Sequence, residues 1–155
     1  MKSRLTLLQY KLFSMQRPVF YPVELTKEGM NPEQLVKALQ NSAKFIYTIP
    51  DIQNPTGFTY SAENRIHIYE ILKDRNVVLI KDDPYGELRF DGERLPYIGA
   101  GKLPNSILLG TFSKTVTPGM RTDFIISENK ELLRCISIAK EASDLHTNIF
   151  SQYLI

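Results

Sequence analysis

Lys114 lies in a short polar loop that carries the groups needed to hold a phosphorylated aldehyde. The loop follows an apolar run at residues 106–109, and Thr111, Ser113 and Arg121 add two hydroxyl groups and a guanidinium to the lysine amine. A lysine amine condenses with an aldehyde when partial desolvation makes its neutral form accessible, and the end of a buried strand offers that environment. Hydroxyl donors and the planar fork of an arginine suit a phosphate. Without this context Lys114 would be read as a solvated loop lysine.

Two other apolar runs also end in polar residues. The run at residues 46–50 leads into Asn54, and the run at residues 77–80 leads into Asp82, Asp83 and Tyr85. A pyridine nitrogen that has to stay protonated needs a carboxylate partner, because the positive ring accepts electrons from a substrate carbanion. Either aspartate could supply that carboxylate, and either could instead brace the turn that follows. The tyrosine phenol and the asparagine amide would add hydrogen-bonding groups to the same ring, although each alone is an ordinary packing or turn residue.

Short apolar runs alternate with helical segments along the chain, and this order predicts an α/β fold with parallel strand pairing. We expect strands at 19–25, 45–49, 77–80, 107–111 and 124–126, a short extended piece at 87–90, and helices at 1–15, 32–40, 61–76 and 130–146. In an open parallel sheet, ligands bind beyond the carboxyl ends of the strands. Asn54, Asp82, Tyr85 and Lys114 are therefore expected at one edge of one sheet.

Three stretches in this order resemble the fold type I, pyridoxal phosphate (PLP)-dependent aminotransferases of class I/II, in particular their aminoadipate-type and broad-specificity branch. The stretches are residues 47–57 with Gln-Asn-Pro-Thr-Gly, residues 82–90 with Asp-Asp-Pro-Tyr-Gly, and residues 110–121 with Lys114. The resemblance implies a three-layer αβα major domain with a mostly parallel sheet. It also implies transfer of an amino group between an amino acid and a 2-oxo acid, in a homodimer.

The resemblance assigns roles around the cofactor ring. It implies that Lys114 forms a Schiff base with PLP and later shuttles a proton between the substrate carbon and the cofactor carbon. Asp82 would be the partner of the pyridine nitrogen, by its spacing of three residues before the tyrosine, and Asp83 would be structural. Tyr85 and Asn54 would bind the phenolic oxygen of the cofactor and lower the pKa of the Schiff base.

The phosphate would be held by Thr111, Ser113 and Arg121 according to the same resemblance. One position departs from the family pattern. Asp123 stands where the family has a glycine two residues after the phosphate arginine. Either its side chain turns away, or its negative charge weakens the binding of the cofactor.

A chain of 155 residues fits one domain with a sizeable core. The resemblance implies that residues 1–155 are the central part of the large PLP-binding domain, incomplete at both ends. The expected missing parts are an N-terminal segment that contributes phosphate donors and a stacking aromatic residue, and a small C-terminal domain that carries the substrate-carboxylate arginine.

The bulk properties point to no nucleic-acid or membrane partner. The formal net charge is +2 with both signs spread along the chain, and no apolar stretch approaches the ~20 residues that span a bilayer. Cys135 is the single cysteine, so the chain forms no internal disulfide, and we expect a cytoplasmic protein.

Two alternatives to an aminotransferase follow from the same residues. One is the effector-sensing domain of a PLP-dependent transcriptional regulator, which would carry a helix-turn-helix domain upstream. The other is an inactive, truncated fragment. The expected absence of the two segments and the presence of Asp123 would support this alternative.

Overall fold

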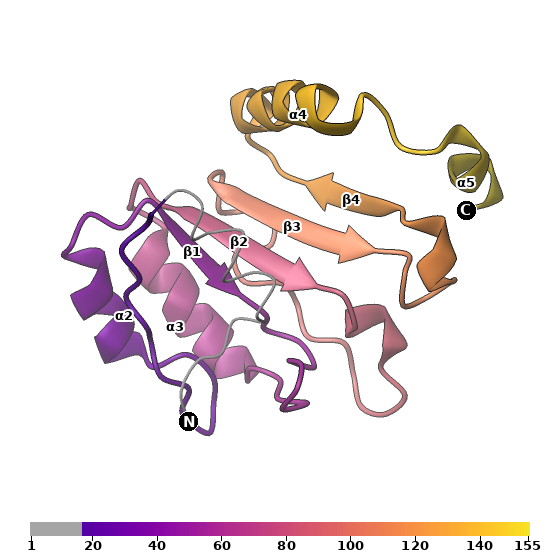
Figure 1. Ribbon diagram of the computed structural model, residues 1–155. Coiled ribbons are helices and arrows are strands. Elements are labelled where there is room, and N and C mark those ends of the chain that lie inside the picture. The colour runs from indigo at the N-terminus through magenta and orange to yellow at the C-terminus, as the bar shows by residue number, and fades with distance from the viewer. Residues whose placement is uncertain (1–16) are drawn as a thin grey trace.

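The computed structural model of the protein describes residues 17–155, and its centre is a four-stranded sheet in the order β1-β2-β3-β4. Strands β1 (Phe45–Thr48), β2 (Val78–Asp83) and β3 (Ser106–Thr111) are parallel, and β4 (Asp123–Ile126) runs antiparallel to β3. The arrowheads of β1, β2 and β3 accordingly point the same way, and β4 points back (Figure 1). The α/β prediction with a mostly parallel sheet is confirmed.

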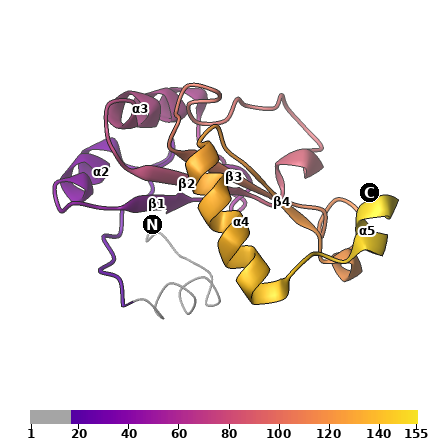
Figure 2. The same cartoon turned by 90° about the horizontal axis from the view of Figure 1, so that it is seen from above.

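Local capping signals set the two helices that cover one face of this sheet. Helix α2 (Pro32–Leu39) begins after Asn31, whose side chain accepts a hydrogen bond from the Gln34 amide, and has proline at its first position. Helix α3 (Ala62–Leu72) begins after Ser61, which caps the Asn64 amide in the same way. Both helices lie on the same side of the sheet (Figure 2). The starts predicted for these two helices are confirmed.

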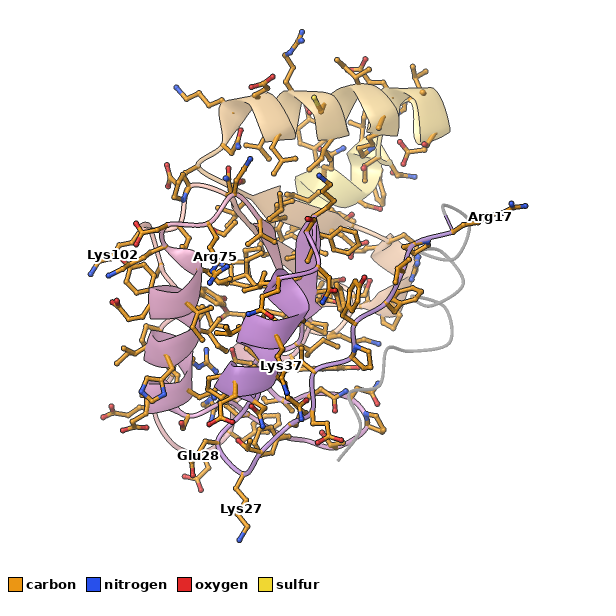
Figure 3. The ribbon with its side chains drawn as sticks, turned by 90° about the vertical axis from the view of Figure 1, so that its left-hand side faces the viewer. Arg17, Lys27, Glu28, Lys37, Arg75 and Lys102 are labelled. Atoms are coloured by element: carbon orange, nitrogen blue, oxygen red, sulfur yellow. The ribbon has the colours of Figure 1, made fainter. Side chains whose placement is uncertain are left out.

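The hydrophobic core lies between these helices and the sheet. Its members come from α2, α3, β2 and four connecting segments: Met30, Leu35, Tyr60, Ile68, Leu72, Val77, Leu79, Ile98 and Leu103. Lys37 lies on the exposed side of α2, Lys27 and Glu28 lie on the loop below this helix, and Lys102 lies beside α3 (Figure 3). Charges of both signs therefore meet the solvent on this side.

Strand β2 divides the polar residues at its end between the two faces of the sheet. Leu79, Lys81 and Asp83 are buried on the side of α3, and the residues between them are half-buried and point to the opposite face. Asp82 belongs to that opposite face. The sequence placed both aspartates after the strand, but β2 continues to Asp83 because residues 82 and 83 still pair with Leu109 and Gly110 of β3.

The remaining part of the chain differs from the prediction at three places. Residues 19–25 form no strand, and only Leu25 makes an isolated bridge, to Met30, because two prolines in residues 18–22 have no N–H to give to a ladder. Residues 86–88 form a 3-10 helix (Gly86–Leu88) instead of an extended piece. Helix α5 (Ile149–Leu154) was not predicted. The helix expected at 1–15 lies outside the described residues.

Helix α4 (Lys130–Asp144) follows β4 and matches the helix predicted at 130–146. It runs past the β4 side of the sheet, and its far end reaches the face opposite α2 and α3 (Figure 2). No helix within residues 17–155 is long and apolar enough to cross a bilayer.

Candidate active site

Lys114, Tyr85 and Asn54 come together beyond the carboxyl ends of the three parallel strands. The Lys114 Nζ atom lies 5.9 Å from the centroid of the Tyr85 ring. The Asn54 Nδ2 atom donates a hydrogen bond of 3.2 Å to the Tyr85 hydroxyl. Each residue follows a different strand: Asn54 comes after β1, Tyr85 after β2 and Lys114 after β3. The structure thus joins three of the residues that the strand pattern placed at one edge.

The Lys114 side chain is exposed, whereas the sequence favoured a partly desolvated amine. The strand before it is buried at Ser106 and Ile107, but the chain turns at residues 112–116 beyond the sheet and carries the lysine outward. The face of the Tyr85 ring lies on one side of the amine.

Asp82 projects from the sheet face that also carries Thr111. Its carboxylate Oδ2 accepts a short hydrogen bond from the hydroxyl of Tyr47 on β1. The register sets Asp82 beside Leu109, two residues before Thr111, so their side chains share one face. Tyr47 orients this carboxylate, and the sequence reasoning assigned it no role. Strand alternation is the signal that would have found it, because Tyr47 pairs with Ile80 on the same face as Asp82.

Asp83 braces the chain on the other side of the sheet. Its Oδ1 atom accepts a hydrogen bond of 2.7 Å from the Gly86 amide, and its Oδ2 atom accepts one of 3.0 Å from the Tyr97 hydroxyl. Burial and the nearby Asp83 charge raise the pKa of Tyr97 to about 12. A side chain at Gly86 would lie within 2.4 Å of the carboxylate, so this turn has no room for one. The structural role expected for Asp83 is consistent with these bonds.

The phosphate candidates lie on a loop that closes on itself. The Phe112 amide donates to the Thr122 carbonyl at 3.0 Å, which brings Arg121 back toward the end of β3. The Ser113 amide donates to Thr111 Oγ1 at 3.0 Å, so the threonine hydroxyl keeps its own proton to donate. Among residues 17–155, Arg121 is exposed and forms no ion pair with a carboxylate.

Asp123 pairs directly with Thr111 in the antiparallel ladder. Opposed residues in such a pair point to the same face with their Cβ atoms about 5 Å apart. Asp123 is exposed, and the register sets its side chain on the same face of the sheet as that of Thr111. Of the two outcomes open for Asp123, the register favours a negative charge near the phosphate candidate Thr111.

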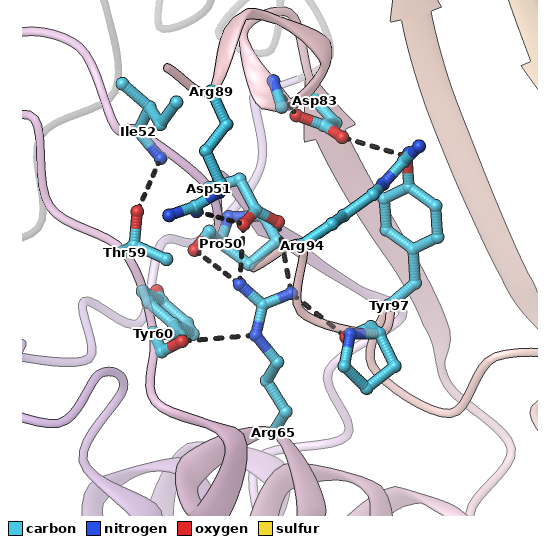
Figure 4. Close-up of polar contacts among 12 residues, drawn as sticks. Pro50, Asp51, Ile52, Thr59, Tyr60, Arg65, Asp83, Arg89, Arg94 and Tyr97 are labelled. Carbon is cyan, nitrogen blue, oxygen red and sulfur yellow. Dashed lines mark hydrogen bonds and ion pairs between the residues drawn. The ribbon is translucent and has the colours of Figure 1, made fainter. Parts of the chain in front are cut away.

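A buried ion pair holds the segment that leads into Asn54 (Figure 4). Arg65 of α3 makes a bidentate contact with Asp51, with bonds of 2.8 and 3.0 Å, and their side chains are 3% and 7% exposed. The same guanidinium donates to the carbonyls of Pro50, Tyr60 and Pro96. The sequence reasoning missed this pair, since Asp51 and Arg65 lie 14 positions apart and Arg65 lies in none of the three motif stretches.

Lys81 is a second notable lysine and is separate from the candidate site. Its amine is buried on the α3 side of β2, 3.4 Å from the Ile98 carbonyl and 5.7 Å from the centroid of the Tyr97 ring. Burial lowers the pKa of Lys81. Because it points to the face opposite Asp82, its amine and that of Lys114 do not serve one ligand.

Comparison with known proteins decides the family of the chain. Residues 10–152 match the model of the family described as aminotransferase class I and II. The chain belongs to this family. The chain is 38% identical to aromatic-amino-acid aminotransferase 1 of Thermococcus litoralis, over 92% of the chain and 36% of that protein. It is 35% identical to 2-aminoadipate transaminase of Thermus thermophilus, over 92% of the chain and 37% of that protein.

Solved structures agree with this family assignment. The α-aminoadipate aminotransferase LysN of Thermus thermophilus, complexed with N-(5'-phosphopyridoxyl)-L-leucine, superimposes with a TM-score of 0.84 at 34% identity, over 90% of this chain and 37% of that one. Kynurenine aminotransferase of Pyrococcus horikoshii, in complex with PMP, superimposes with a TM-score of 0.76 at 36% identity, over 84% of this chain and 34% of that one. The chain spans a little more than a third of the length of the curated relatives named above.

Proposed function

We propose that this chain is the cofactor-binding core of a PLP-dependent aminotransferase, which moves an amino group from an amino acid to a 2-oxo acid. The observation that carries the proposal is the approach of the Lys114 amine to Tyr85, itself bonded to Asn54, beyond the ends of three parallel strands. Family membership and the phosphopyridoxyl ligand named for a similar structure support it. We further propose that residues 1–155 form the central part of the large domain.

The donor set fits PLP at each of its polar groups. An exposed amine can reach an aldehyde, and a carboxylate oriented by Tyr47 suits a pyridine nitrogen. A phenol and an amide suit the ring oxygen, and two hydroxyls with a guanidinium suit the phosphate. The residues proposed to hold these groups are Lys114 for the aldehyde, Asp82 for the nitrogen, Asn54 and Tyr85 for the ring oxygen, and Thr111, Ser113 and Arg121 for the phosphate.

The residues of the chain then have distinct tasks. When bound, PLP supplies an electron sink for negative charge that develops on the substrate carbon. Asp82 keeps a proton on the ring nitrogen, since a fixed carboxylate favours the protonated base. The Asn54 amide occupies a lone pair of the Tyr85 hydroxyl, so the hydroxyl proton is free to be donated to the cofactor oxygen.

Lys114 has two tasks, as a nucleophile and as a carrier of a proton. Its amine would be the nucleophile for the PLP aldehyde, whose oxygen would leave as water, and as a free amine it would accept a proton from the substrate carbon and pass it on. The face of the Tyr85 ring attracts the charged amine by about 0.5–1 kcal/mol at an exposed site. Tyr85 therefore holds the amine near its working position while it carries the proton.

The relatives reported above are named as aminotransferases, which favours an enzyme over the regulator alternative. Two further parts of the proposal are a cytoplasmic location and a homodimer. The C-terminal part of the chain exposes large apolar side chains, among them Ile126 at 56%, Phe150 at 71% and Tyr153 at 87%. Exposed apolar surface of this kind is typical of an interface.

Reductive trapping tests the cofactor claim directly. PLP is added to the folded chain, the mixture is reduced with borohydride, and the digested peptides are weighed by mass spectrometry. We expect the phosphopyridoxyl mass on the peptide with Lys114 and its loss in Lys114→Ala, whereas the exposed Lys102→Ala serves as a matched control that keeps the adduct. A folded protein without an adduct, or an adduct unchanged in Lys114→Ala, would contradict the proposal.

A further inference from the structure

We propose that Asp51, Arg65 and Arg89 are positioning residues that fix the Asn54–Tyr85 pair in front of Lys114. This inference rests on the proposed function, in which Asn54 and Tyr85 bind the ring oxygen of PLP. It concerns three residues that lie away from Lys114 and carry none of the cofactor-binding roles assigned above.

The starting point is the double connection between two loops. The segment 51–54 follows β1, and the segment 85–89 follows β2. At one end, Asn54 donates to the Tyr85 hydroxyl at 3.2 Å. At the other end, Arg89 Nη2 lies 3.5 Å from Asp51 Oδ1. The two loops are thus joined at both of their ends.

The segment 85–89 is a single short turn, so movement at one end reaches the other. Tyr85 precedes the 3-10 helix Gly86–Leu88 and its carbonyl accepts a hydrogen bond of 2.9 Å from the Leu88 amide. Arg89 directly follows the helix. A tether on Arg89 therefore restricts where the Tyr85 side chain can lie.

Asp51 can serve as a fixed anchor because Arg65 holds it. The bidentate contact uses both carboxylate oxygens, and the guanidinium is itself bound to carbonyls on either side of the segment, at Pro50 and Tyr60. Arg65 also reaches the Pro96 carbonyl of a third loop. Helix α3 and the core beneath it thereby set the position of Asp51 (Figure 4).

Arg89 is the part of the network that can be changed with least damage to the fold. Its side chain is 22% exposed, and its Nη2 atom has the ion pair with Asp51 but no hydrogen bond to any residue of the described chain. Loss of Arg89 leaves the Asp51–Arg65 pair whole, whereas loss of Arg65 would strand a buried carboxylate. Arg89→Gln is therefore the informative variant, and Arg89→Lys retains the charge.

Arg94 provides a matched control that contacts the same helix. It forms an ion pair of 2.6 Å with Glu87, within the 3-10 helix, and its side-chain hydrogen bond goes to Tyr97 and not to the segment 51–54. Arg94→Gln consequently removes an arginine and an ion pair from this helix while the link to Asp51 stays. General loosening of the helix would affect both variants alike.

Amide hydrogen exchange of the full chain without cofactor is the first measurement. The reporters are the amides of Ile52, bonded to Thr59, and of Leu88, bonded to Tyr85. In Arg89→Gln we expect exchange about threefold faster or more at both reporters. In Arg94→Gln we expect no faster exchange at the Ile52 amide, and any increase is confined to the Leu88 amide. Unchanged exchange at Ile52 in Arg89→Gln, or an equal increase there in Arg94→Gln, overturns the proposal.

The second measurement is the pH midpoint of the visible absorbance of the PLP-loaded full chain. Donors on the ring oxygen favour its deprotonated form, so a displaced Asn54–Tyr85 pair raises the midpoint, by about half a pH unit or more. We expect this rise in Arg89→Gln, a smaller one in Arg89→Lys and none in Arg94→Gln. An unmoved midpoint in Arg89→Gln overturns the positioning role. A wild-type chain that binds no PLP refutes the proposed function instead, and the exchange data then still decide the inference.

Discussion

Gly110→Ala tests the packing that sets β3 against β4, next to the phosphate loop. A Cβ atom at position 110 would lie 2.1, 2.5 and 2.7 Å from three ring carbons of Phe124, the residue paired with it on β4. The ring must move, and with it the contact to Phe112, whose centroid is 5.4 Å away. Overpacking of this kind costs about 1–3 kcal/mol.

A smaller effect opposes this cost. Alanine restricts the unfolded chain more than glycine does, which stabilises the native state by about 0.4–1 kcal/mol where the backbone allows it. Gly110 lies in a regular strand and has no positive φ, so the gain applies here. Phe124 is 38% exposed and can swing outward in part. The expected net loss is about 1–2 kcal/mol in the free energy of unfolding.

Urea unfolding followed by circular dichroism measures the loss, and a double-mutant cycle assigns it. With Phe124→Ala in the background, Gly110→Ala should cost little or nothing, which gives a coupling energy of about 1 kcal/mol or more. Gly119→Ala is the control, because a Cβ there meets nothing closer than Thr117 at 3.9 Å. A loss under about 0.5 kcal/mol for Gly110→Ala, or one that persists with Phe124→Ala, would refute the steric reasoning.

Two further predictions concern charge. Burial lowers the pKa of Lys81 from its ordinary 10.5, so between the folded-state pKa and 10.5 the unfolded chain binds a proton that the native chain lacks, and the free energy of unfolding rises with pH across that window. Lys81→Met should flatten this rise in pH-dependent urea unfolding, and an unchanged slope would contradict the assignment. Asp123→Asn removes a negative charge from the face of Thr111 and should tighten PLP binding about two- to fivefold in an absorbance titration. The exposed Glu93→Gln is the control, and an affinity that stays equal or falls would show that Asp123 does not repel the phosphate.

The parts of the fold that depend on neighbouring residues could be predicted from the sequence. Asn31 and Ser61 each cap a helix by a bond that spans three residues, so the signal and its partner stand together in the chain. The strand expected at 19–25 does not form, and the reason is local as well: its β-branched and aromatic residues favour a strand, but Pro18 and Pro22 have no N–H to donate to a ladder.

The parts that depend on register or on distant pairs could not be predicted. Asp51 and Arg65 are 14 positions apart, and the sequence around each residue does not indicate that they pair; they meet only when α3 packs on the sheet. The bond from Tyr47 to Asp82 spans 35 positions and depends on how β1 pairs with β2. The exposure of Lys114 depends on where the chain leaves the sheet, and the apolar residues before it do not determine that point.

The different positions of Asp82 and Asp83, on opposite faces of the sheet, follow from the two-residue period of a strand. Neighbouring residues on β2 point to opposite faces, so Lys81 and Asp83 are committed to the α3 side as soon as Leu79 enters the core. Asp82 is then left on the other face, with Tyr47. A shift of the β2 register by one residue would exchange the two carboxylates and turn Leu79 out of the core. The burial of Leu79 therefore determines which aspartate can face a cofactor, although the leucine lies far from any chemistry.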